Sequence, residues 1–293
     1  ALGSRTFQQL VRRAVRRSNT VLPLLPHTAR GAGQVVALHM RRSELLARFI
    51  YSVVASGAAF LPLDSAYNVS VVQYRIEDSS ARSCFVDRFS DIALSCDTIV
   101  AGFAQLQSCV QQGAAFCDGG QFAYLLYTSG STGAPKGLAI LQKNVVNFSQ
   151  WCFTNAFQVS AHDVFMWQSS ISFDMMIGIL FWTAQSGGRL CSITDGYEIN
   201  SSYIYRAVQR SGTTMIFIVP SHLSALMLSG LTGDSVRHIM VGGEALSSRF
   251  AVSCSAAFER SIVVNFYGPT ETTVGVTCFE IKERSQMHFE ASV

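Results

Sequence analysis

The residues best suited to chemistry gather in one loop, residues 128–137, which follows the apolar run at residues 122–127. Its glycines leave backbone N–H groups free to turn toward an anion, its hydroxyl side chains add donors, and its lysine adds a positive charge. These groups together meet the needs of a triphosphate. The sequence therefore predicts a phosphate site formed by Thr128, Ser129, Gly130, Ser131, Thr132, Gly133 and Lys136.

This loop differs from the Walker A phosphate loop, which has Gly directly before its Lys and Ser or Thr directly after it. Pro135 and Gly137 occupy those two places. The alternative is a flexible surface turn that joins a strand to a helix, although so many hydroxyls and glycines behind a buried strand are uncommon in a simple connection.

A second group of polar residues follows the apolar run at residues 262–266. Gly268 and Pro269 break this run, so the next side chains project from a strand end, where α/β proteins place ligands. The carboxylate of Glu271 could hold Mg²⁺ against phosphate oxygens. The alternative is an ordinary loop with a helix cap.

Two other positions stand at the ends of apolar stretches. Gly242 and Gly243 would let a flat ring approach the backbone, with a plain turn as the alternative. Asp174 is a lone carboxylate in the strongly apolar stretch 172–182, and burying it is costly unless a cation pairs with it. It binds a cationic group, caps the following helix, or does both.

Composition excludes several other classes. The chain has 293 residues, 49% hydrophobic and 14% charged, with a net charge of +3, which places it far from disordered sequences. No apolar stretch reaches the ~18 to 20 residues of a membrane span. The eight cysteines and six histidines show no metal-ligand spacing, so we expect free thiols in a reducing, cytoplasmic compartment. A Gly-x-Ser-x-Gly elbow of the serine hydrolases is also missing.

Nine arginines among the first 50 residues could indicate a targeting segment or a nucleic-acid arm. At residues 7–17, however, the arginines take one face of a helix and apolar residues the other, which favours an amphipathic surface helix. We therefore expect neither a nucleic acid nor a membrane as partner.

Short apolar runs alternate with segments of helical periodicity, which predicts an α/β layered fold with largely parallel sheets in one compact unit. Ser43 is the expected N-cap of a helix over residues 44–55, and two further helices are expected over residues 143–153 and 201–210. The expected strands cover residues 35–38, 60–63, 83–86, 122–127, 214–219, 238–241 and 262–266.

The loop at residues 127–137 resembles the signature loop of the adenylate-forming (AMP-binding) superfamily. Other segments resemble core motifs of its adenylation domains in nonribosomal peptide synthetases, and they run in the family's order along the chain. These segments are residues 6–10, residues 56–67 with 74–79, Phe173 and Asp174 with Gly187 and Gly188, residues 241–246 and residues 265–273.

The resemblance implies roles for these residues. Lys136, Thr270 and Glu271 would be catalytic, with Glu271 on Mg²⁺ and Thr270 on the α-phosphate. Tyr267 would stack on adenine and Asn265 would bond its amino group. The nucleotide site would also include Gly243, Glu244, Phe266 and Gly268.

For the substrate, the resemblance implies that Asp174 binds the α-ammonium group of an amino acid. The family's pocket positions fall on Asp174, Met175, Gly178, Phe217, Met240, Gly242, Phe266 and Val274. Apart from Asp174 none of them is polar, so the selected side chain is expected to be apolar.

The implied reaction uses ATP and Mg²⁺ to form an acyl adenylate, which a phosphopantetheine thiol on a carrier protein domain then captures. The alternatives are a stand-alone acyl-CoA synthetase and a noncatalytic nucleotide-binding or scaffold fragment. By this resemblance we expect residues 1–293 to be only the N-terminal core of the family's domain, without its C-terminal subdomain and the catalytic Lys of that subdomain. We therefore expect this piece alone to be weakly active or inactive.

Overall fold

The computed structural model describes residues 33–87, 94–101, 120–129, 135–231 and 234–281. The expected amphipathic helix at residues 7–17 and the motif at residues 6–10 lie outside these residues. So do Gly130, Ser131, Thr132 and Gly133 of the expected phosphate loop.

The first half of the chain forms a six-stranded sheet in the order β4-β3-β1-β2-β5-β6. All neighbours are parallel except β5 and β6, which run antiparallel at one edge. The strands are β1 (Val35–His39), β2 (Ala59–Leu63), β3 (Ser83–Asp87), β4 (Asp97–Ala101), β5 (Phe122–Thr128) and β6 (Lys136–Leu141).

The second half forms another six-stranded sheet in the order β12-β11-β10-β9-β7-β8, again parallel except for an antiparallel edge strand, β12. Its strands are β7 (Val164–Trp167), β8 (Arg189–Ser192), β9 (Met215–Ile218), β10 (His238–Gly242), β11 (Ile262–Tyr267) and β12 (Thr277–Ile281). The expectation of an α/β fold with largely parallel sheets is therefore confirmed.

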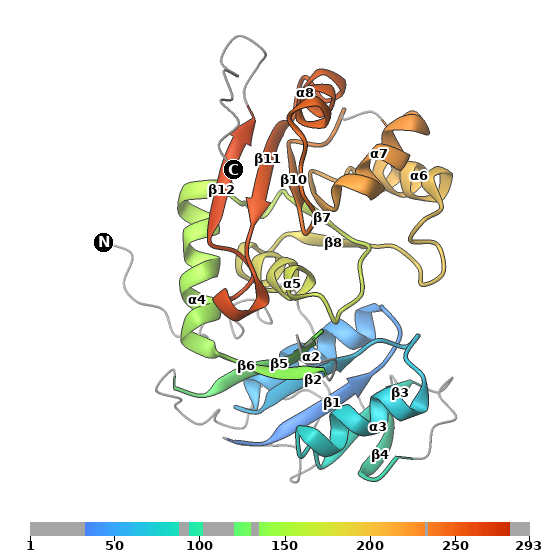
Figure 1. Ribbon diagram of the computed structural model, residues 1–293, viewed down its shortest axis with the longest axis vertical. Coiled ribbons are helices and arrows are strands. Elements are labelled where there is room, and N and C mark those ends of the chain that lie inside the picture. Colours follow the sequence, from blue (N-terminus) through green and yellow to red (C-terminus); the bar gives the residue numbers. More distant parts are fainter. Residues whose placement is uncertain (1–32, 88–93, 102–119, 130–134, 232–233, 282–293) are drawn as a thin grey trace.

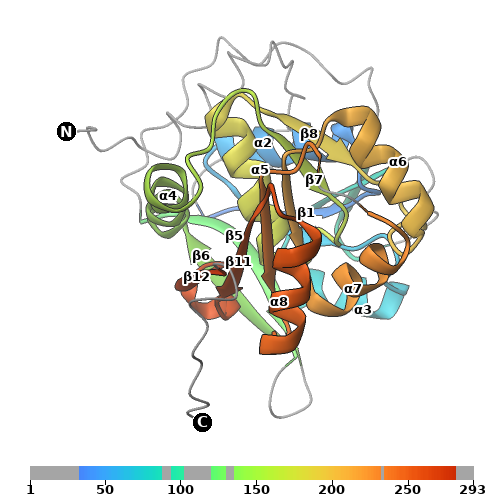
Figure 2. The ribbon, with the colours of Figure 1, turned by 90° about the horizontal axis from the view of Figure 1, so that it is seen from above.

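Helices separate and cover the two sheets (Figure 1). α2 (Glu44–Ala55) and α5 (Asp174–Ser186) pack between them, and the core there takes side chains from both sheets. α3 (Val69–Asp78) covers the outer face of the first sheet, while α6 (Ser201–Ser211), α7 (Pro220–Leu228) and α8 (Ser248–Ala257) cover the outer face of the second (Figure 2). α4 (Gln142–Trp151) packs beside α5 and continues into a π-helical turn at Cys152–Ala156.

The three helices expected in the described residues are present, and so are the seven expected strands. The Leu46 N–H donates to Ser43 Oγ at 3.2 Å, as the expected N-cap requires. A helix after Asp174 was expected only within the alternative that Asp174 caps it, and the residue range of α5 was not predicted. Almost every one of its side chains is buried, so it lacks the polar face that gives a surface helix its periodicity.

The cysteines are less scattered in space than in sequence. Cys84 and Cys96 lie within hydrogen-bonding reach of each other, and none of the six cysteines of the described residues forms a disulfide. In the same part of the chain, none of the helices is long and apolar enough to cross a membrane. The described residues also contain no group of three His, Cys, Asp or Glu side chains that could hold a metal ion.

Candidate functional site

The expected phosphate loop lies at the tip of a β-hairpin. Thr128 ends β5 and pairs with Lys136, which begins β6. The alternative interpretation, a turn between a strand and a helix, is therefore wrong, because an antiparallel strand follows the loop. Ser129 and Lys136 are both exposed, so the hairpin presents their polar groups to water.

Helix α3 braces both ends of this hairpin tip. The Tyr74 hydroxyl donates to the Pro135 carbonyl oxygen at 3.2 Å, and the Tyr127 hydroxyl donates to Asp78 Oδ2 at 2.6 Å. The Arg75 guanidinium stacks 4.4 Å from the centre of the Tyr67 ring and 5.2 Å from that of Tyr127. The sequence motif at residues 74–79 gave no role to these side chains, and the structure assigns them to positioning the loop.

The second expected tip follows β11 as a 3₁₀ turn, η5 (Thr270–Thr272). A Cβ on Gly268 would lie 2.3 Å from the Cα of Gly275, so glycine is required where the turn returns beside its own start. Thr273 and Val274 have positive φ values of 66° and 71°, which non-glycine residues rarely adopt. Such strained backbone often occurs where a turn is held in place for function. The turn leaves Glu271 exposed.

The two tips meet. η5 contacts β6, and the red turn in Figure 1 lies between the two sheets, beside α5. Thr270 hydrogen-bonds the Asp174 carboxylate at the start of α5, and the Glu271 charge acts on the same carboxylate. The fold thus brings the hairpin, the turn and the start of α5 to one place.

Asp174 has a carboxylate that the protein leaves partly unpaired. Its Oδ2 is buried with no hydrogen-bond partner. Desolvation raises the pKa of Asp174, the Thr270 hydrogen bond opposes that shift, and the Glu271 charge adds to it. Asp174 is the first residue of α5 and Phe173 is the N-cap, so the expected alternative of a capping role is wrong. A bound cation would satisfy the free oxygen.

Tyr124 is a neighbour of Asp174 that the sequence did not single out. Its side chain is fully buried on β5, and its hydroxyl has no hydrogen-bond partner. Burial is the main cause that raises the pKa of Tyr124, and the negative charge of Asp174 raises it further. A tyrosine in an apolar strand carries no sequence signal for such a position.

The expected nucleotide residues of the second sheet lie at the ends of β10 and β11. Gly242 and Phe266 are register partners, which places Gly243 beside Tyr267 at the same sheet edge. The Tyr267 ring is 65% exposed and free to stack, whereas Asn265 is half-buried. Glu244 is also exposed but accepts hydrogen bonds from the Ser221 N–H at 3.0 Å and its hydroxyl at 2.8 Å, at the start of α7.

The expected substrate residues come together as one buried group. They come from α5 (Met175, Gly178), β9 (Phe217), β10 (Met240, Gly242), β11 (Phe266) and the segment after η5 (Val274). Their apolar side chains all belong to the core cluster between the two sheets. Asp174 begins α5, about one helical turn before Gly178.

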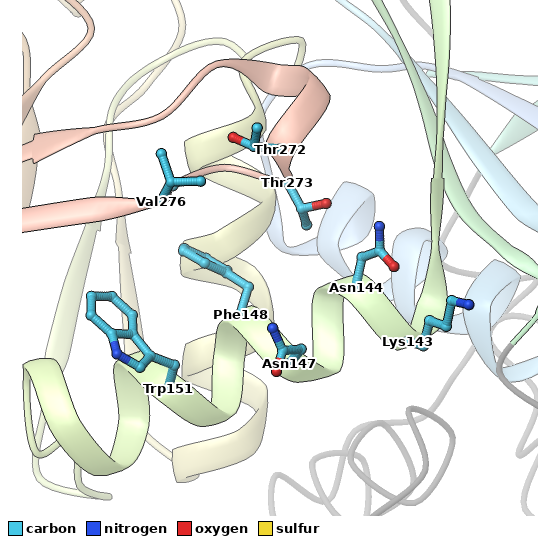
Figure 3. A pocket seen from close by; sticks show the side chains of 9 residues that line it. Lys143, Asn144, Asn147, Phe148, Trp151, Thr272, Thr273 and Val276 are labelled. Carbon is cyan, nitrogen blue, oxygen red and sulfur yellow. The ribbon is translucent and has the colours of Figure 1, made fainter.

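A polar groove lies next to this group (Figure 3). It has a volume of about 590 Å³ and runs between α4 and the segment that follows Glu271. Its walls are formed by Lys143, Asn144, Asn147, Phe148, Trp151, Thr272, Thr273, Gly275 and Val276. None of these residues was among the site residues expected from the sequence.

Comparison with known proteins gives a consistent result. A family model described as AMP-binding enzyme matches residues 3–292. Vanchrobactin synthetase VabF of Vibrio anguillarum is 31% identical over 263 residues, which cover 85% of this chain and 9% of that protein. Zwittermicin A synthase ZmaJ of Bacillus cereus is 29% identical over 283 residues, covering 90% of this chain and 53% of that protein. The chain thus spans from about a tenth to about half of the length of these relatives.

Solved structures show the same fold. The nonribosomal peptide synthetase FmoA3 in its AMPPNP-bound form gives a TM-score of 0.83 at 18% identity, covering 96% of this chain and 33% of that one. The N-terminal subdomain of NpsA from Klebsiella oxytoca, in complex with anthranilyl-AMSN, gives a TM-score of 0.77 at 18% identity, covering 96% and 70%. The two-sheet arrangement described above is therefore that of the N-terminal subdomain of adenylate-forming enzymes.

Proposed function

We propose a function from one premise: the chain belongs to the family of AMP-binding enzymes. In this proposal it activates the carboxylate of an amino acid as an acyl adenylate, using ATP. A phosphopantetheine thiol on a carrier domain then forms a thioester bond to the acyl carbon, while the bond from that carbon to the phosphate oxygen breaks and AMP leaves. The observation that carries the proposal is the meeting of β6, η5 and the start of α5 around the unpaired carboxylate of Asp174.

ATP would lie across the edge where these elements meet. Lys136, Thr128, Ser129 and the rest of the hairpin loop would bind the phosphates, and Tyr267 and Gly243 would hold the adenine ring. The exposure of Lys136, Ser129 and Tyr267 in the protein supports these roles, because each offers its binding group to a ligand.

Glu271 suits Mg²⁺, which usually takes one or two protein carboxylates and completes its shell with phosphate oxygens and water. Its exposed carboxylate stands on the turn that contacts β6, and no larger cluster of ligands is needed for a metal bound in this way. Magnesium bound there would neutralise charge on the phosphate oxygens.

Asp174 would pair with the α-ammonium group and so orient the amino acid. The buried apolar residues beyond it support an apolar substrate side chain. A carboxylate oxygen of the substrate then forms a bond to the α-phosphorus, and the bond from that phosphorus to the pyrophosphate oxygen breaks. Positioning and charge neutralisation supply the catalysis, and no protein nucleophile takes part.

Pyrophosphate exchange into ATP tests this proposal in the full-length protein that contains the chain. We expect an amino acid to stimulate exchange and Asp174→Asn to lower kcat/KM by roughly 100-fold, as the loss of a buried charge partner does. Asp234→Asn serves as control, since this exposed carboxylate lies just before the amino end of β10, whereas Gly242 is at its carboxyl end. Exchange stimulated by fatty or aryl acids and insensitive to Asp174→Asn would instead indicate an acyl-CoA synthetase. No exchange with any acid would indicate a scaffold.

A further inference from the structure

Phe148 of α4 packs against the buried apolar group. A Cβ on Gly178 would lie 3.3 Å from Phe148 Cε1, and a Cβ on Gly275 would lie 3.3 Å from Phe148 Cε2. Two glycines therefore face this ring, one on α5 and one after η5. At Gly275 a Cβ would also lie 2.1 Å from Phe266 Cζ, so no side chain fits there, whereas at Gly178 a Cβ would fit only tightly.

Other aromatic rings hold Phe148 in this position. Its ring stacks on Trp182 with centroids 5.6 Å apart and meets Phe266 edge-on at 6.3 Å. Phe266 in turn meets Phe217 edge-on at 5.8 Å. Because each ring is packed against the next, Phe148 has little freedom to swing aside.

The apolar group leaves little room for the side chain of a substrate. Its side chains are at most 8% exposed, and Phe148 is 5% exposed. An empty subsite large enough for a long side chain would expose its lining to solvent. The open groove of about 590 Å³ lies on the other side of Phe148, which forms part of its wall (Figure 3). Phe148 is thus the partition between the buried group and the groove.

We infer that Phe148 is a further specificity-determining residue, which closes the side-chain subsite at Gly178 and Gly275 and restricts the substrate to amino acids with small apolar side chains. This inference rests on the proposed function. Without the ring, the subsite would open into the groove, and longer side chains would find space there.

Stable aminoacyl sulfamoyl adenosines, which mimic the acyl adenylate, test the inference by calorimetric titration of the full-length protein. The series carries the side chains of alanine, leucine and phenylalanine. We expect the wild-type protein to bind the alanyl compound at least about tenfold more tightly than the phenylalanyl one, a discrimination of the size that a pocket achieves against added methylenes. Phe148→Ala should remove or reverse that preference.

Trp151→Ala provides the matched control. Trp151 lines the same groove from the same helix, and its exposed ring lies at the outer rim. We expect this variant to keep the wild-type order of affinities. If Phe148→Ala fails to fold, Phe148→Leu, which keeps an apolar side chain but loses the ring, should show the same change of preference.

AMPPNP binding distinguishes a failure of the inference about Phe148 from a failure of the proposed function. If the wild-type protein binds AMPPNP but prefers the phenylalanyl compound, or if Phe148→Ala and Phe148→Leu keep the wild-type order, the inference is overturned while the proposed function stands. If the wild-type protein binds neither AMPPNP nor any compound of the series, the proposed function fails and the inference fails with it.

Discussion

At the scale of single residues, Asp174 shows how a binding group can lower the stability of the ligand-free protein. Its buried oxygen has no partner, and desolvation raises its pKa. The folded protein therefore favours the protonated form of this carboxyl more than the unfolded chain does. Whatever stability this difference contributes is present below the unfolded pKa of about 3.9 and is lost as pH rises through the higher native pKa.

Asp174→Asn should therefore stabilise the ligand-free protein at pH 7, by about 1 kcal/mol, because it removes an unpaired buried charge. The gain should shrink as pH falls through the native pKa of Asp174. Urea unfolding at a series of pH values measures this, with Asp234→Asn as the control. A variant less stable than the wild-type protein at pH 7 would contradict the desolvation argument.

The sequence predicted Asp174 because a lone carboxylate stands out in an apolar stretch. It also predicted Lys136 and Glu271, since glycine, proline and hydroxyl residues mark the loops that carry them. It could not predict Tyr124 or Phe148. Both are aromatic residues in apolar segments, and only the packing of distant elements reveals what they face.

At the scale of elements, a hydrogen-bonded cluster fixes the amino ends of three strands of the second sheet, at the opposite end from the expected ligand residues. Asp163 precedes β7 and is 2% exposed. It accepts hydrogen bonds from Arg237 Nε at 2.7 Å and Arg237 Nη2 at 2.8 Å, ahead of β10, and from the Thr214 hydroxyl at 2.8 Å, ahead of β9. This cluster joins the amino ends of three neighbouring strands.

Asp163→Asn should cost about 2 kcal/mol at neutral pH, less than the ~3 to 5 kcal/mol of a fully buried pair, because the Arg237 guanidinium that it leaves without its carboxylate is 35% exposed. Burial alone would raise the pKa of Asp163, but the hydrogen bonds from Arg237, Ser160 and Thr214 outweigh it and hold the pKa at about 2. Because the native pKa is lowered, this stability is present above the unfolded pKa of about 3.9 and is lost as pH falls toward the native pKa.

Unfolding midpoints of both proteins between pH 7 and pH 2 provide the measurement. The difference between wild type and Asp163→Asn should be constant at neutral pH and close to zero at the acid end. A difference that stays the same down to the acid end would show that the carboxylate charge contributes nothing.

Local signals accounted for part of these elements. The run of apolar residues predicted β1 and β10, and the side chain of Ser43 predicted the start of α2. The edge strand β6 was missed because it begins within the polar loop and alternates between buried and exposed residues only weakly. The positive φ values at Thr273 and Val274 could not be predicted, because neither threonine nor valine is a residue type that indicates such a conformation.

At the scale of the whole molecule, one arginine joins the two halves of the chain. Arg42 lies between β1 and α2, and its side chain is only 6% exposed. It donates to Asp195 Oδ1 at 2.7 Å and to the Ser169 carbonyl oxygen at 3.1 Å, and it also pairs with Glu198. All three partners belong to connections of the second sheet, so this cluster helps to fix one sheet relative to the other.

Arg42→Ala should lower the free energy of unfolding by about 2 kcal/mol. This is less than the ~3 to 5 kcal/mol of a fully buried pair, because water reaches the acidic partners. Arg48→Ala is the control, since its i,i+4 pair with Glu44 lies within one helix and Glu44 is 68% exposed, so the pair should contribute about 0.5 kcal/mol or less. Equal losses in the two urea titrations would contradict the role given to Arg42.

The layered arrangement could be predicted only in outline. Alternation of strands and helices indicated an α/β fold, and the family resemblance indicated its type. The division into two sheets with α2 and α5 between them depends on long-range packing. An apolar run does not indicate which distant strand or helix it will pack against. The same long-range packing brings β6, the η5 turn and Asp174 together.

The affinity of the protein for AMPPNP with Mg²⁺, compared with its affinity for adenosine, tests most directly whether the hairpin and the η5 turn serve one nucleotide. We expect Lys136→Ala and Glu271→Gln each to weaken AMPPNP binding by about tenfold or more, the size of a lost charge-assisted contact, while adenosine binds all three proteins equally. Unchanged AMPPNP affinity in either variant would contradict the account.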